Sequence, residues 1–238
     1  MTPTIHCRLC GTVIQPATAE RTKGVCMRCV RGPGANSDTI LHRLIADNTP
    51  LPKVLTALQG ALMETSLGVA QEASFKLQAE GIYGFWLYHH VFQYACATVF
   101  TEAGLDAVTR RYREQGNPDH TREMLRWSPC DSPHHLYRER AFGVVDTLFG
   151  TVERYGRSEA AEVEIHRALL RALRKIRLAK VFAPSVVLSL VNADHPPEEP
   201  YVYAEEFCEP AALNSFRTEL GDLREDYLAH YRSGMPAY

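Results

Sequence analysis

The sequence predicts an α+β domain, in which a mixed or antiparallel sheet is flanked by long helices, with a small N-terminal zinc-ribbon module. Three observations support this prediction. Two C-x2-C pairs lie in the first thirty residues, apolar residues recur at helical spacing over 51–77 and 158–180, and β-branched or aromatic runs occupy 82–99 and 186–191. A chain of 238 residues, 45% of them hydrophobic, is long enough to form one sizeable core and a small appendage.

The two cysteine pairs predict one structural zinc ion. A C-x2-C turn brings two thiolates to one ion, and two such turns complete a tetrahedral site. All four ligand positions are then filled by cysteine, so no open position remains for a catalytic water. The alternatives are a pair of disulfides or a thioredoxin-like redox motif, but no βαβ unit follows. The expected ligands are Cys7, Cys10, Cys26 and Cys29.

The composition divides the chain into three parts. Residues 1–31 form the zinc module, which is too short to fold without its metal. Residues 32–38 are rich in Gly, Pro and small polar residues and are the expected linker. Residues 39–238 form the α+β domain, beginning with a short helix over 39–47.

The first half of this domain predicts a long helix followed by a hairpin. Five leucines, one valine and one alanine, spaced by three, four and seven residues, define an amphipathic helix over 51–77, with Pro52 in its first turn. Residues 82–88 and 94–99 then form two strands joined by a turn over 89–93. Because both runs are almost continuously apolar, we expect this hairpin at the centre of a sheet covered on both faces.

The second half alternates helices and strands. Thr101 is the expected cap of a helix that begins at Glu102. A strand is predicted over 123–127, a loop over 128–133, helices over 135–155 and 158–180, and a strand over 186–191. An exposed acidic loop over 194–200 precedes a last helix, which begins at Pro210 and ends before Gly234.

Several short motifs from Tyr83 onward resemble an uncharacterised bacterial family, domain of unknown function 4303. They are the aromatic strand Tyr83-Gly84-Phe85-Trp86-Leu87-Tyr88, the strand-to-helix passage 98–105 with its Thr-Glu pair, and Arg126-Trp127-Ser128-Pro129-Cys130-Asp131. A long helix pair and the strand 186–191 complete the likeness, which covers about two thirds of the chain. Ser132 stands where the family commonly has Trp, and the cysteine-rich front is not part of the family pattern.

The resemblance implies no established reaction and no catalytic residues. It implies an immunity or partner-binding role in a bacterial toxin system, which is an association and not a physical argument.

Two charged regions are candidate interaction surfaces. From 194 to 226 there are ten acidic residues against two arginines, which predicts attraction of a basic protein partner, with Glu198, Glu199, Glu205 and Glu206 as candidate contacts. One face of the 158–180 helix carries Arg167, Arg171 and Arg174, a candidate anion- or nucleic-acid-binding stripe. The alternative for these arginines is a solvated face or an internal partner for the acidic C-terminal third.

Cys130, Asp131, His134 and His135 lie within six residues and are a candidate second metal site or Cys/His catalytic pair. The simpler interpretation is a loop with a capping Asp131 and surface imidazoles. No triad, nucleophile elbow or Gly-rich phosphate loop is present in the sequence.

The leading expectation is therefore a non-catalytic, cytoplasmic protein-interaction protein with one zinc ion. The alternatives are a nucleic-acid-associated regulator and, third, a Cys/His enzyme. A net charge of −2 gives no general attraction to nucleic acid or anionic lipid. No apolar run reaches the length of a membrane span and no secretory signal is visible.

Overall fold

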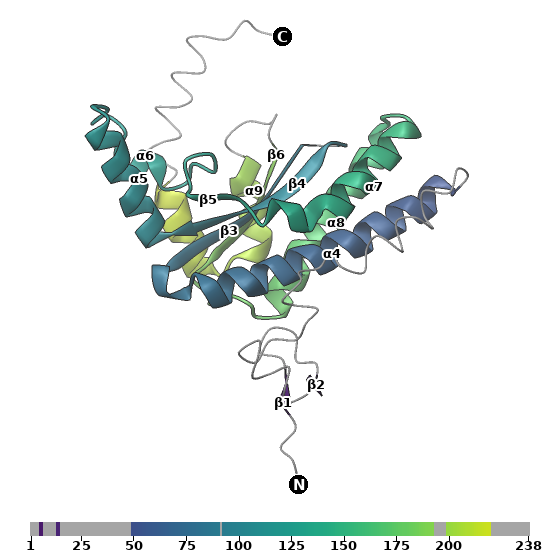
Figure 1. Ribbon diagram of the computed structural model, residues 1–238, viewed down its shortest axis with the longest axis horizontal. Coiled ribbons are helices and arrows are strands. Elements are labelled where there is room, and N and C mark those ends of the chain that lie inside the picture. The colour runs from purple at the N-terminus through teal and green to yellow at the C-terminus, as the bar shows by residue number, and fades with distance from the viewer. Residues whose placement is uncertain (1–4, 7–12, 15–48, 91, 193–198, 220–238) are drawn as a thin grey trace, which may run out of the picture.

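The computed structural model describes residues 5–6, 13–14, 49–90, 92–192 and 199–219. A four-stranded sheet lies at the centre of the domain, with helices packed against both of its faces (Figure 1). The elements are α4 (Leu51–Lys76), β3 (Ile82–His90), β4 (Tyr94–Thr101), α5 (Glu102–Glu114), α6 (Arg122–Leu125), β5 (His134–Tyr137), α7 (Gly143–Arg154), α8 (Glu159–Leu178), β6 (Val187–Asn192), α9 (Glu199–Phe207) and a helix over 210–219. The predicted α+β class is confirmed.

The strand order is β5-β4-β3-β6, and the sheet is mixed. β3 pairs antiparallel with β4, which places Phe85 opposite Val99, and parallel with β6, which places Phe85 beside Leu188. β5 pairs antiparallel with β4 at the other edge. The β3–β4 hairpin therefore occupies the centre of the sheet, as its unbroken apolarity predicts.

Three helices cover the first face of the sheet. α4, α7 and α8 lie together there (Figure 1) and bury Phe85, Leu87, Val99 and Leu188 in one continuous core. The apolar residues of α8 that recur at helical spacing, from Ile165 to Ile176, are buried. Ser158 caps α8 by accepting a hydrogen bond from the Ala161 amide. The long helix predicted over 51–77 is likewise confirmed as α4.

The second face holds a smaller aromatic core. Trp86, Phe100 and Val187 of the sheet are buried against Trp127 and against Phe216 of the helix over 210–219. α9 contributes Ala204 to this core and Phe207 to the first one, and therefore packs along β6 between the two faces. With both faces covered, β3, β4 and β6 have no solvent side, and this explains why they lack alternating polarity.

The structure corrects two sequence predictions. Residues 123–127 were expected to be a strand, but the short helix α6 forms there, with the Thr121 hydroxyl accepting a hydrogen bond from the Met124 amide. The helix expected over 135–155 begins only at Gly143, because residues 134–137 pair with β4 as strand β5. The backbone groups at the edge of β4 would otherwise lack hydrogen-bond partners. Pairing with this edge therefore stabilises residues 134–137 as a strand more than their local propensity stabilises a helix. Helix α9 was not predicted.

In the N-terminal region, the structure describes β1 (Ile5–His6) paired antiparallel with β2 (Val13–Ile14). The four expected zinc ligands, the linker over 32–38, the helix over 39–47 and the loop over 194–198 lie outside the described residues. Of the described helices, none is both long enough and apolar enough to cross a membrane.

Candidate functional site

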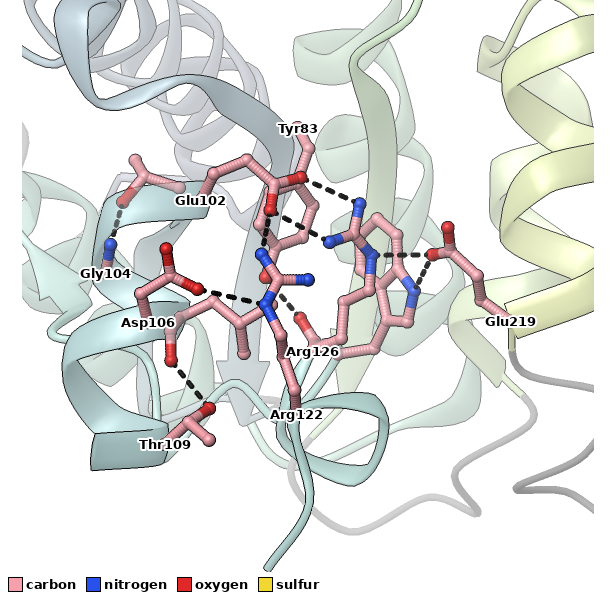
Figure 2. A network of polar contacts seen from close by, with 11 residues as sticks. Tyr83, Glu102, Gly104, Asp106, Thr109, Arg122, Arg126 and Glu219 are labelled. Atoms are coloured by element: carbon pink, nitrogen blue, oxygen red, sulfur yellow. Dashed lines mark hydrogen bonds and ion pairs between the residues drawn. The ribbon is translucent and has the colours of Figure 1, made fainter. Parts of the chain in front are cut away.

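Arg126 is the centre of a polar network that joins three distant parts of the chain. Its guanidinium donates from Nε to Glu219 Oε2 at 2.8 Å, and its Nη2 lies 3.0 Å from Glu102 Oε1 (Figure 2). The same guanidinium lies over the Tyr83 ring, 4.1 Å from the ring centre, while the Tyr83 hydroxyl donates to the Arg126 carbonyl. Arg126 thus connects β3, the start of α5 and the helix over 210–219.

Arg122 extends this network toward α5. It bonds to Glu102 and, through Nε, to Asp106 Oδ1 at 3.0 Å. Burial alone would raise the pKa of Glu102, but the hydrogen bonds from Arg126 and Arg122 outweigh it and hold this pKa below its usual value. Glu102 is therefore an ionised anchor for two arginines, a role that its helix-start position alone did not indicate.

Trp127 holds the helix over 210–219 against the sheet. Its ring stacks on Trp86 at a centroid distance of 5.5 Å and meets Phe216 edge-on at 4.6 Å. Its Nε1–H donates to Glu219 Oε2 at 2.8 Å. A Cβ on Gly84 would lie 2.8 Å from the Trp127 ring, so β3 requires glycine at this position. The glycine and the tryptophan of the family motifs are thus explained by one contact.

Asp131 closes the same motif into a compact loop. Its Oδ2 accepts from the Ser128 hydroxyl and its Oδ1 from the Tyr112 hydroxyl of α5, both at 2.6 Å. Asp131 therefore fixes the loop to α5 by accepting hydrogen bonds from two side-chain hydroxyls.

A cleft of about 520 Å³ opens beside Trp127. Its walls are Trp127, the start of β6 around Val187, and the helix over 210–219, which contributes Ala212 and Phe216. Glu209, Glu219 and Arg126 form its polar rim. Because Arg126 already bonds to two carboxylates, the rim is acidic on balance. Trp127 and Glu219 are 92 residues apart, and no local sequence signal predicts their meeting.

The acidic residues predicted to bind a partner have different surroundings. Glu205 and Glu206 are exposed on α9 and form ion pairs with the exposed residues Arg217 and Arg174. Glu199 begins α9, and Glu198 lies outside the described residues.

The arginine stripe of α8 has partners within the chain. Arg167 pairs with Glu164 at 2.6 Å, Arg171 bonds to the Gln59 side chain of α4, and Arg174 pairs with Glu206. Arg174 is thus an internal partner for the acidic C-terminal third, one of the two roles that the sequence left open.

The cysteine and histidine cluster does not converge on one point. His134 Nε2 lies 2.8 Å from Glu80 Oε2, and His135 Nδ1 lies 2.9 Å from the Thr98 hydroxyl. Burial lowers the pKa of His135, while Cys130 is exposed. Within the described ranges, no three His, Cys, Asp or Glu side chains are placed to share a metal ion. The expected ligands Cys7 and Cys10 lie in sequence between the paired strands β1 and β2.

Comparison with known proteins identifies the family of this chain. The family described as Domain of unknown function (DUF4303) matches residues 69–202, from the second half of α4 to α9. The match includes Gly84, Glu102 and the Arg126–Asp131 motif, and it ends before the helix over 210–219 that carries Glu219. No curated protein and no solved structure matches the chain. The match spans more than half of the 238 residues, so the chain belongs to the family described as Domain of unknown function (DUF4303).

Proposed function

We propose that this chain is a non-catalytic, cytoplasmic protein that binds another protein, and that its partner is basic. The observation that carries the proposal is the cleft beside Trp127, which combines an aromatic floor with an acidic rim. A nuclease toxin neutralised by its immunity protein is the kind of pair that fits this chemistry.

The cleft has the properties of an anchor site in a protein interface. Tyr83, Pro184 and Ala211 supply accessible apolar surface above the buried rings of Trp127 and Phe216, and Glu209 supplies an exposed carboxylate at the edge. Binding energy in protein interfaces concentrates where a side chain of one partner fills such a pocket on the other. An arginine or lysine side chain fits it best, because its aliphatic stem packs on the rings and its charged end reaches the rim.

The exposed acidic residues of α9 extend the surface next to the cleft. Glu205 and Glu206 form ion pairs with Arg217 and Arg174, all of them solvent-exposed. Exposed pairs of this kind contribute only about 0–1 kcal/mol each. A basic partner can therefore replace the intramolecular arginines at little cost.

The N-terminal module is proposed to bind one structural zinc ion through Cys7, Cys10, Cys26 and Cys29. The antiparallel pairing of β1 and β2 supports this proposal, because it brackets the segment that carries Cys7 and Cys10. C-x2-C spacings of this kind are typical of structural zinc sites.

A nucleic-acid-associated regulator is the competing function. It would use the zinc module together with Arg167, Arg171 and Arg174. The carboxylates of Glu164 and Glu206, which pair with Arg167 and Arg174, weigh against it, because they would repel a phosphate backbone.

The experiment that tests the proposal is quantitative partner capture from extracts of the native host, followed by mass spectrometry. Ala211→Arg places a long cation in the cleft and should reduce recovery of the partner at least tenfold. Asn214→Arg is the matched control, because Asn214 is exposed on the same helix but does not line the cleft. Equal capture by both variants would contradict the proposed site.

A second measurement tests the charge argument. Replacing Glu198, Glu199, Glu205 and Glu206 by Gln should slow association with the captured partner and reduce its salt dependence, with thermal stability unchanged. Nanomolar binding of DNA or RNA at physiological salt, lost when Arg167, Arg171 and Arg174 are replaced, would instead establish the regulator.

A further inference from the structure

A second groove, of about 550 Å³, lies between α5 and the segment over 118–123. One wall is a stripe of α5 that carries Thr109, Arg110 and Arg113, at helical spacings of one, three and four residues. The other wall carries His120 and Arg122. This groove shares no lining residue with the cleft beside Trp127.

The groove has an excess of positive charge. Of its two carboxylates, Asp106 is bonded to Arg122, and Glu123 is exposed on α6. Within the part of the chain that the structure describes, no carboxylate forms an ion pair with Arg110 or Arg113. Two exposed guanidiniums, one helical turn apart, therefore face a concave surface with their charge available for a ligand.

The position of the opposite wall is fixed by contacts outside the groove. The His120 ring stacks on the Tyr112 ring with a centroid distance of 4.3 Å and an angle of 1° between the planes. The Tyr112 hydroxyl in turn donates to Asp131 at 2.6 Å. The imidazole is thus held in place before any ligand arrives, which lowers the entropic cost of binding.

We infer that this groove binds the phosphate group of a small phosphorylated ligand, with Arg110 and Arg113 as the charged contacts and His120 as a further donor. Arginine suits this role because its planar fork donates two parallel hydrogen bonds to a phosphate. The volume matches that of sites for ligands of nucleotide size. Apart from Pro118, every lining residue has a polar or charged side chain, which favours a small charged ligand over an apolar protein surface.

The test is calorimetric titration of the full-length protein with inorganic phosphate, pyrophosphate and ADP at 50 mM and 150 mM salt. Pyrophosphate should bind with one site per chain, and Arg110→Gln and Arg113→Gln should each weaken it about 10- to 100-fold. Arg111→Gln is the control, because it removes the same charge from the same helix but lies outside the groove. Its effect should be less than threefold.

Comparison of the ligands identifies the source of the phosphate. Equal affinity for pyrophosphate and ADP would assign the site to the phosphates alone, and tighter binding of ADP would add a nucleoside contact. The inference is overturned if pyrophosphate does not bind below millimolar concentration, or if Arg111→Gln weakens binding as much as Arg110→Gln. It is also overturned if a polyglutamate peptide displaces pyrophosphate at similar concentration, since the groove would then be a docking surface for an acidic protein. Shifts of the His120 ring resonances on titration of the unmodified protein give a readout that does not depend on any variant.

Discussion

Replacing Trp127 by alanine should remove a large part of the stability of the domain. The side chain is 7% exposed and its ring contacts Trp86 and Phe216. Truncation of a buried tryptophan typically costs about 3–5 kcal/mol. The Nε1–H bond to the Glu219 carboxylate is part of this loss, because hydrogen bonds to charged groups are worth about 1.5–3 kcal/mol. Against a total of about 5–15 kcal/mol, the variant should be severely destabilised.

Urea unfolding followed by fluorescence and circular dichroism measures this loss. The chain has two tryptophans, so Trp86 is the remaining fluorophore in Trp127→Ala and reports directly on the second core. Trp127→Phe keeps a ring but loses the indole donor, and should cost about 1.5–3 kcal/mol. A loss below about 1 kcal/mol for Trp127→Ala would refute the reasoning, because the helix over 210–219 would then not depend on this ring.

Three further predictions concern other parts of the chain. Gly84→Ala should lower the free energy of unfolding by about 1–3 kcal/mol, since the new Cβ would lie 2.8 Å from the Trp127 ring, and a neutral result in urea unfolding would argue against that packing. Burial raises the pKa of Asp146 to about 6 in the folded state from 3.8, so the folded state binds the proton more tightly and stability falls as pH rises from about 4 to about 6. Because Asp146 is only half-buried, solvent screening reduces the effect, and Asp146→Asn should gain about 1–2 kcal/mol over the wild type at pH 7.5 and little at pH 4. Thermal unfolding across pH measures this gain, and a gain that does not change with pH would contradict the assignment. Purified protein should contain close to one zinc per chain by elemental analysis, and Cys10→Ser should lose it, whereas full retention of zinc in the variant would exclude Cys10 as a ligand.

The ion pairs of Arg122 and Arg126 could not be predicted from the sequence. The motif Arg126–Asp131 resembles a family pattern, but its residues are explained by contacts with distant parts of the chain. Arg126 bonds to Glu102, 24 residues earlier, and to Glu219, 93 residues later. Side-chain pairing across such separations has no periodic signature, because it depends on how elements dock and not on how each one forms.

The sequence by itself determined the elements whose stability is local or whose burial is complete. The spacing along α4 and α8, the cap at Thr101 and the apolar runs of β3, β4 and β6 were sufficient. Helix periodicity, capping and hydrophobic burial each depend on residues that are close together in the sequence.

Only the tertiary structure decided the elements and sites that depend on distant partners. Residues 134–137 became a strand because β4 offered an edge, and α9 was stabilised by packing along β6. The cleft beside Trp127 exists because the helix over 210–219 docks onto the second face of the sheet, and the groove beside Arg110 and Arg113 exists because α5 faces the segment over 118–123. Each of these features is formed by contacts between segments that are far apart in the sequence. No local pattern in either segment predicts the contact, because the stabilising free energy comes from the docking of the two segments in the folded chain.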